Sequence, residues 1–496
     1  MGEAIISSKT RKPQMGRDSG WLIGSDLIAI FLALAGQIVL TKALLTETYG
    51  IYIIALDAFA TFFLIIDLGL PTIIARDGAN SVEKIWPSIT RVYKLQLLCS
   101  IPFILLAVIG TPLLVDNWKE YFELLVICGA IALVHIASYA PRSGLRAAGQ
   151  ARLEAWSKVI ERAITVAGYY ILYSLESTSV TAFATVFLIG AIGGLAMALG
   201  LSYSILPKIR ISEISDWSDL SESWIDNKTL LLQALPFAIT LGVLPYVIRI
   251  EKFLVAGEIG VDAAAVFHVA QLAWLAGLVV PQALRAALLP VLGEVRSAPE
   301  KFQSALENSL NLCLGVLPIG LFAGAGIVYF LLPAAFPEQY VDGSLGASAV
   351  DLFMVLLAGW CLTLLATPTY TALQAGEKPW NFTLFISLVV VFAVIIGYFL
   401  IDWKANDSQG SGLFAAALAS TISSSFLLFL SIHLSSNWNL IRQRKKDFTL
   451  AICLSMISCY GFTTGSWLAI SGLGLFYFIP QGIQAMSATV EPLSEE

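Results

Sequence analysis

The sequence predicts an all-α polytopic membrane protein with twelve to fourteen transmembrane helices. Hydrophobic residues make up 57% of the 496-residue chain, charged residues only 13%, and the mean hydropathy is +0.79. Soluble globular chains carry about 25% charged residues, so much of the usual solvating charge is missing. Apolar runs of about 20 residues, enough to cross a bilayer core, recur between short polar stretches. The alternating patterns of half-buried strands or one-sided helices do not account for such runs.

Twelve apolar runs are predicted to be spans, and a longer run follows them. The first contains Asp26 and continues to Leu45, so we expect a retained helix and not a cleaved signal peptide. The last run, 448–483, is too long for one span and barely long enough for two. We expect two short helices there, with a turn near Thr463–Gly465. The twelve predicted spans are 21–45, 50–75, 92–115, 121–141, 155–174, 181–206, 230–250, 264–291, 304–332, 349–370, 381–401 and 412–433.

Lysine and arginine residues are distributed unevenly between the two sides of this arrangement. With the N-terminus in the cytoplasm, all but five of the 29 fall on the cytoplasmic side or at its helix ends. Positive residues stay on the cytoplasmic side of membranes, so the pattern predicts a multi-pass protein with a cytoplasmic N-terminus. The five outer residues are Lys42, Lys119, Arg249, Lys252 and Lys404.

The chain is expected to contain two related halves of six spans each. A lysine, a glycine and a proline recur at the same intervals: Lys42, Gly50 and Pro71, then Lys252, Gly260 and Pro281. Repeats of even span number in one orientation are related by an axis along the membrane normal. The predicted organisation is a cytoplasmic tail (1–20), an N-lobe (21–206), a cytoplasmic linker with an interfacial amphipathic helix (207–229), a C-lobe (230–433), a basic cytoplasmic loop (434–447), an additional helix pair (448–483) and a C-terminal tail (484–496).

Motifs for covalent chemistry are missing from the sequence. It contains no GxxxxGK(S/T) phosphate loop, no HExxH and no CxxC pair, and its six cysteines lie in apolar runs, where they serve as small packing residues. We therefore expect no catalytic residues, no metal, no cofactor and no nucleic-acid partner. No soluble insert is long enough for a nucleotide-binding domain, which excludes ATP-driven transport within this chain.

Acidic residues inside the predicted spans are candidates for ion coupling. Burying a charge in a membrane costs roughly 2.5–3.5 kcal/mol or more, so such residues are usually functional. Asp57, seven residues inside its span, is the first candidate, and Asp26, Asp67 and Glu251 are the others. For Asp67, a helix cap or a packing hydrogen bond is the structural alternative. His135 lies alone in mid-span and is expected to be a hydrogen-bonded core residue.

Cationic residues near the ends of the spans are candidates for binding an anionic substrate. Arg285 and Arg76 would grip a phosphate bidentately, or would extend to the lipid headgroups instead. Lys42, Arg249 and Lys252 are expected to gather at the outer ends of the first and seventh spans. They would receive an anionic group there, or Arg249 would form a structural ion pair with Glu251, and both interpretations stay open.

Several short segments resemble polysaccharide and O-antigen exporters. Tyr49–Tyr52, followed by Asp67–Pro71 and an arginine, is similar to their second span. Ala234–Phe237, followed by Arg249–Lys252, is similar to their seventh and eighth spans, and Leu145–Gln150 fits the loop after their fourth. By these motifs the chain resembles the Wzx-type lipid-linked oligosaccharide flippases of the MOP (MATE-like) superfamily.

The resemblance implies a MATE-like fold, in which two pseudo-symmetric six-helix lobes enclose a central cavity that opens to either side in turn. The cargo would be a polyprenyl-pyrophosphate-linked oligosaccharide, such as an O-antigen unit of lipopolysaccharide, flipped across the cell inner (plasma) membrane. Membrane lipid and polysaccharide polymerase or export proteins are the implied partners. A water-filled cavity suits such cargo, because unsatisfied polar groups in hydrocarbon cost several kcal/mol each.

Two other functions stay open at this stage. A MATE-type cation-coupled exporter of small organic cations would use the same fold with an acidic cavity. The aspartates of the first two spans favour this function, whereas the arginines favour a cargo that carries a pyrophosphate. A membrane glycosyltransferase, glycan polymerase or ligase would need an active site on a large outer loop. The longest outer loop expected here, Pro333–Ser348, is short and has no convincing carboxylate pair.

Overall fold

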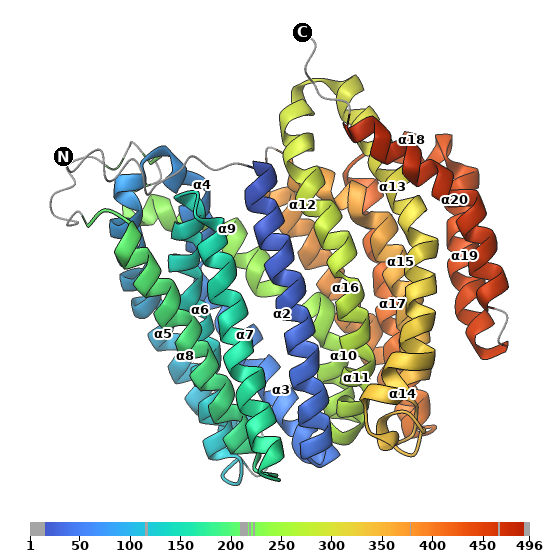
Figure 1. Ribbon diagram of the computed structural model, residues 1–496, viewed down its shortest axis with the longest axis horizontal. Coiled ribbons are helices and arrows are strands. Elements are labelled where there is room, and N and C mark those ends of the chain that lie inside the picture. The colour runs from blue at the N-terminus through green and yellow to red at the C-terminus, as the bar shows by residue number, and fades with distance from the viewer. Residues whose placement is uncertain are drawn as a thin grey trace. The chain divides into compact units, whose positions relative to one another are not determined.

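The computed structural model describes residues 15–114, 118–208, 217, 220–221, 224–376, 378–464 and 467–490. Every regular element in this part of the chain is helical (Figure 1). Ten segments of it are long and apolar enough to cross a membrane, or eleven when one interrupted pair counts as a single span. The all-α polytopic prediction is thereby confirmed. The tail residues 1–14 and 491–496 and most of the predicted linker helix (209–216, 218–219 and 222–223) lie outside the described residues.

The chain divides into two compact units, Met1–Pro245 and Tyr246–Glu496. The first contains α2 (Met15–Ala43), α3 (Thr46–Phe63), the 3₁₀ turn η1 (Leu64–Asp67), α4 (Leu70–Asp77), α5 (Ile85–Leu114), α6 (Phe122–Ala147), α7 (Ala151–Ser174), α8 (Val180–Ile205) and α9 (Asn227–Val243). The second contains α10 (Tyr246–Glu258), α11 (Val261–Gly277), α12 (Val279–Glu294), α13 (Pro299–Gly326), the π-helical turn η7 (Ile327–Leu331), α14 (Leu332–Ala335), α15 (Ala349–Gln374), α16 (Pro379–Ala405), α17 (Gln409–Leu434), α18 (Trp438–Gln443), α19 (Lys445–Thr464) and α20 (Trp467–Val490).

The division between the units falls inside the predicted seventh span. That span is interrupted at Leu244 and Pro245, between α9 and α10. Proline has no amide donor and its ring clashes with the preceding turn, so it ends α9. α9 packs within the first unit, against α4 and η1. The compact unit therefore extends beyond the predicted N-lobe and includes the linker and α9.

The predicted second span is broken just before Pro71. Leu68 (φ 56°) and Gly69 (φ 67°) both adopt left-handed backbone conformations between η1 and α4. A Cβ on Gly69 would lie 2.7 Å from the backbone nitrogen of Ala238 in α9. Only glycine combines this conformation with so close an approach. The repeat pattern pairs Pro71 with Pro281. Pro281 also lies in the first turn of a helix, α12, that follows an interruption.

In the second unit, α15 is the central helix. It contacts α11, α12, α13, α16, α17 and α19, and most of its side chains are buried. In the region of the predicted final pair the structure has two helices, α19, which ends at Thr464, and α20, which begins at Trp467 (Figure 1). α20 packs along α13, and α19 contacts α15.

Candidate functional site

α7 carries an unusual number of charges for a helix inside a membrane unit. Its charged residues are Arg152, Glu154, Lys158, Glu161 and Arg162. Glu154, Lys158 and Glu161 follow one another at intervals of four and three residues, so they share one face of the helix. α7 packs against α2, α6 and α8. The charges on this face therefore need partners on the neighbouring helices.

Glu161 is held by two side chains of α6. Its Oε2 accepts a hydrogen bond from Arg142 at 2.7 Å, and its Oε1 lies 3.0 Å from Nε2 of His135. Arg142 also donates through Nε to the hydroxyl of Ser157 at 3.1 Å. Only 4% of the Glu161 side chain and 9% of the Arg142 side chain are exposed. His135 is hydrogen-bonded, as predicted, but it belongs to a buried ionic cluster and is not isolated.

A second chain of charges leads from this cluster to α2. Glu154 is fully buried and accepts hydrogen bonds from Nε of Arg146 at 2.8 Å and from its NH2 group. Lys158 lies 3.4 Å from the same carboxylate and 3.1 Å from the carboxylate of Asp26 on α2. Asp26, a predicted ion-coupling residue, is exposed, and it is paired with this lysine.

Two glycines of α8 bring that helix directly against the Glu161 face. A Cβ on Gly194 would lie 2.6 Å from Oε2 of Glu161, and one on Gly190 would overlap the hydroxyl of Thr165. Small residues four positions apart allow membrane helices to approach closely. The Glu161 carboxylate is thus enclosed by α6, α7 and α8.

The acids of α3 and η1 have different environments. Asp67 is 2% exposed, and Nε2 of Gln96 donates to its backbone carbonyl at 3.1 Å and lies 3.4 Å from its carboxylate. This is the packing hydrogen bond that the sequence left open as an alternative to ion coupling. Asp57, the first ion-coupling candidate, is half-buried on α3.

Two ionisable residues of the second unit are buried side by side on α10. Glu251 is 0% and Lys252 is 1% exposed. Nζ of Lys252 lies 3.0 Å from Nδ1 of His268 on α11. When the lysine ammonium donates to Nδ1, a neutral imidazole carries its own proton on Nε2. Neither carboxylate oxygen of Glu251 has a hydrogen-bond partner among the described residues. No described residue, Arg249 included, therefore donates a hydrogen bond to this carboxylate, and the structural ion pair of Arg249 with Glu251 stays a prediction.

The predicted substrate-binding cations also differ in their surroundings. Arg249 on α10 and Arg285 on α12 are half-buried, and Lys42 in the last turn of α2 is exposed. Within the described part of the chain, Arg285 forms no hydrogen bond or ion pair. The expected cluster of Lys42 with the cations of α10 would involve both compact units and stays a prediction.

The last of these cations, Arg76, lies at the end of α4 and is already paired. Its Nε and NH2 donate to the two carboxylate oxygens of Asp77 at 2.6 and 3.0 Å. Asp77 also accepts hydrogen bonds from the hydroxyl of Ser221 at 2.8 Å and from Nε1 of Trp224 at 3.1 Å. Burial by itself raises the pKa of Asp77, but these hydrogen bonds and the charge of Arg76 outweigh it and lower the pKa below its usual value. Asp77 thus anchors the linker between α8 and α9.

Asp77→Asn is expected to loosen this linker and to destabilise the first unit by about 2 kcal/mol, since hydrogen bonds to charged groups contribute roughly 1.5–3 kcal/mol. The folded pKa lies below the unfolded value of about 3.9, so the contribution is complete above that pH and is lost as the pH falls through the lowered pKa. Thermal unfolding at neutral and acidic pH, with trypsin cleavage at neutral pH, measures both effects. Asp407→Asn, which changes an exposed acceptor of Lys404, is the control. Equal linker cleavage in the Asp77 variant and the unaltered protein would contradict the anchor.

The buried charges of α6 and α7 were missed at the sequence level, although a signal for them exists. The two helices are joined only by residues 148–150, so they form an antiparallel hairpin. Positions at similar distances from the join then come close together, and Arg146 and Glu154 lie three and five residues from its midpoint, Gly149. Arg142 lies one further turn away along α6, and Glu161 lies two further turns away along α7.

Comparisons with known protein families and curated sequences give one family match. Residues 15–295 match the model of a family described as "Polysaccharide biosynthesis protein". A comparison with curated protein sequences gives no significant match.

Solved structures of MOP superfamily transporters share the fold. An inward-facing multidrug resistance MATE family transporter aligns with a TM-score of 0.61 and 16% identity, over 84% of this chain and 96% of its own. An outward-facing multidrug resistance MATE family transporter aligns with a TM-score of 0.58 and 14% identity, over 86% of this chain and 97% of its own. A MOP superfamily transporter from Pyrococcus furiosus aligns with a TM-score of 0.57 and 15% identity, over 86% of this chain and 96% of its own. That transporter is described by the reverse polarity of its binding pocket. Identities this low show the fold alone, and they confirm the MATE-like architecture.

Proposed function

Because the chain belongs to the family of polysaccharide biosynthesis proteins, we propose that it flips a polyprenyl-pyrophosphate-linked oligosaccharide across the membrane by alternating access. The family match carries this proposal. In its full form, the cargo is an O-antigen or other polysaccharide repeat unit. The membrane is the cell inner membrane, the N-terminus is cytoplasmic, and polysaccharide polymerase or export proteins act as partners. Family and fold are those of transporters and flippases, and we infer no enzymatic activity.

The charge pattern of the first unit supports an anionic cargo. Three of its acids, Asp26, Glu154 and Glu161, are paired with lysine or arginine and so present little free negative charge. We assign the pyrophosphate contacts first to Arg249 and Arg285. A guanidinium can hold two phosphate oxygens at once, which favours arginine over a point charge.

The remaining predicted residues take supporting roles in this proposal. Lys42 is exposed and would meet the headgroup at one side of the membrane. Lys252 and Arg76 already have partners and would be secondary contacts. Glu251 is our first choice for ion coupling, because a buried carboxylate without a hydrogen-bond donor is satisfied by a proton or a cation. Asp57 is the next candidate, ahead of Asp26 and Asp67.

Export of small organic cations, as in MATE transporters, is the second candidate function. The observation that favours it is the same buried carboxylate of Glu251, together with the multidrug transporters among the structural relatives. The Pyrococcus furiosus relative is described as having a pocket polarity that suggests a different function. For this chain, too, we expect the charge of the cavity, and not the fold, to decide between anionic and cationic cargo.

Neutralising Arg249 and Arg285 together tests the proposal. In cells lacking the gene, the intact protein should restore surface glycan, whereas Arg249→Ala with Arg285→Ala should reduce export at least ten-fold. Lipid-linked precursor should then accumulate on the cytoplasmic face. Arg442→Ala, which removes an exposed arginine on α18, is the matched control.

Unchanged glycan export by the double variant would contradict the proposed contact of Arg249 and Arg285 with the pyrophosphate. If deleting the gene leaves surface glycan intact and makes the cells sensitive to cationic drugs, the second function replaces the first.

A further inference from the structure

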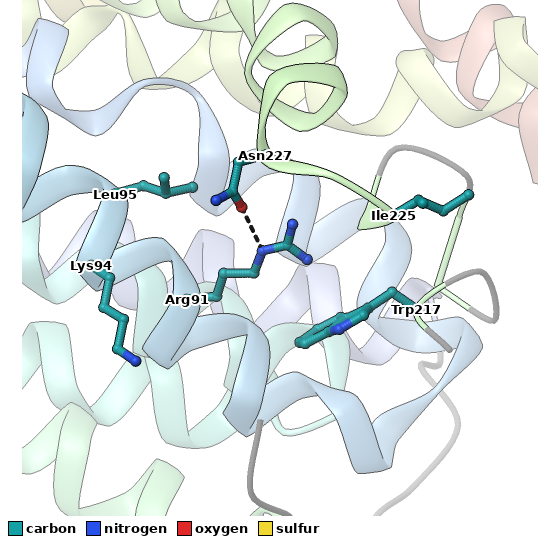
Figure 2. Close-up of a pocket in the computed structure, with 6 residues that line it drawn as sticks. All are labelled: Arg91, Lys94, Leu95, Trp217, Ile225 and Asn227. Carbon is teal, nitrogen blue, oxygen red and sulfur yellow. Dashed lines mark hydrogen bonds between the residues drawn. The ribbon is translucent and has the colours of Figure 1, made fainter. Parts of the chain in front are cut away.

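A pocket of about 330 Å³ lies in the first unit where the linker returns to α9, apart from the charges of α6 and α7. Figure 2 shows the residues that line it. They come from three segments: Arg91, Lys94 and Leu95 from α5, Trp217 and Ile225 from the linker, and Asn227 from the start of α9. The wall therefore combines two cations, an amide, an indole ring and aliphatic side chains.

Arg91 contacts both the linker and the start of α9 at this wall. Its Nε donates to Oδ1 of Asn227 at 2.8 Å, and its NH1 donates to the carbonyl of Trp224 at 2.6 Å. The guanidinium also lies over the ring of Trp217, 4.9 Å from its centroid (Figure 2). Arg91 thus fastens the linker to α5 while its positive charge stays at the pocket.

Lys94 brings a second positive charge that has no other use in the described structure. It is exposed and forms no hydrogen bond or ion pair with any described residue. Asp226, the nearby acid, is engaged at the start of α9, where it caps the backbone nitrogens of Lys228 and Thr229. In Figure 2 the Lys94 side chain points away from the guanidinium of Arg91, so the two cations mark different parts of the pocket.

An exposed apolar face of α5 continues directly from Lys94. Leu98, Ile101 and Leu105 follow it at intervals of four, three and four residues, which places them on one side of the helix. They are 67%, 52% and 55% exposed. On a membrane-spanning helix, such a face suits acyl chains.

We propose that the pocket binds the phosphate headgroup of an anionic membrane phospholipid whose acyl chains lie along α5. Lysine and arginine near a membrane surface attract anionic headgroups, and tryptophan favours this interfacial level. The volume suits a phosphodiester headgroup better than an oligosaccharide. A bound lipid would hold the linker against α5, and with it the start of α9. The inference does not depend on what the protein transports.

The test uses the full chain, purified and mixed with phosphatidylglycerol or phosphatidylcholine, with bound lipids counted by native mass spectrometry. We expect tighter retention of phosphatidylglycerol, and about five-fold weaker retention in Lys94→Ala, the loss expected for one cation at a membrane surface. Lys94→Arg should restore it. Lys119→Ala is the matched control, because Lys119 also lies beside a tryptophan, just beyond the other end of α5.

Arg91→Ala is expected to weaken retention further, but it also releases the linker, so the Lys94 variants decide the question. Equal retention of phosphatidylglycerol by Lys94→Ala and the unaltered protein would overturn the proposal. Displacement of the lipid by millimolar inorganic phosphate would also overturn it and assign the pocket to free phosphate.

Discussion

Arg142→Met is expected to destabilise the first unit by about 3–5 kcal/mol, the usual cost of removing one partner from a buried ion pair. The substitution leaves the carboxylate of Glu161 with His135 as its remaining hydrogen-bond partner, in a site that α8 packs against closely. It also removes the donor to Ser157. The midpoint of thermal unfolding, measured on protein purified in detergent, should fall accordingly.

A double-mutant cycle separates the pair from its neighbours. Replacing both members, as Arg142→Met with Glu161→Met, should cost less than Arg142→Met alone, because no buried charge is left without a partner. Lys404→Met is the control: it breaks an exposed pair with Asp407, and such pairs contribute only about 0–1 kcal/mol. If Arg142→Met and Lys404→Met shift the midpoint equally, the α6–α7 cluster is not a major source of stability.

Glu251→Gln is expected to leave the protein at least as stable as the unaltered chain and to reduce export at least ten-fold. Burying a charged carboxylate costs several kcal/mol, and the neutral amide avoids most of that cost. Glutamine cannot take up and release a proton, so coupling that depends on this group should fail. Unfolding midpoints and the glycan export assay measure the two effects separately.

Glu258→Gln is the matched control. It makes the same glutamate-to-glutamine change on the same helix, but at an exposed position. Loss of stability in Glu251→Gln would mean that the carboxylate serves a structural role. Retained export with retained stability would remove Glu251 from the coupling mechanism and leave Asp57 as the next residue to change.

The surroundings of the buried glutamates thus differ between the two units. In the first unit, Glu154 and Glu161 are each matched by an arginine of the adjoining helix. In the second, Glu251 is buried and receives no hydrogen bond from any described residue, while its neighbour Lys252 is directed to His268. A paired charge stabilises one arrangement of helices. A carboxylate without a partner responds to proton or cation binding, which is what a coupling site requires.

The sequence by itself determined the helices and most of their limits. In a membrane, every backbone group must be satisfied within its own helix, so an apolar run of sufficient length has one stable form. The interruptions follow from local chemistry too. Gly69 and Pro71 mark the break between η1 and α4, and Pro245 ends the continuity of α9 with α10.

Only the tertiary structure decided which charges meet. Asp26 reaches Lys158 across 132 residues of chain, and Asp77 reaches Trp224 across 147. Such pairs depend on which helices pack together and how they are rotated, and neither hydropathy nor spacing within one helix encodes that. His135 showed this limit most clearly: it is isolated among apolar neighbours in sequence, yet it is joined in space to a carboxylate of the next helix.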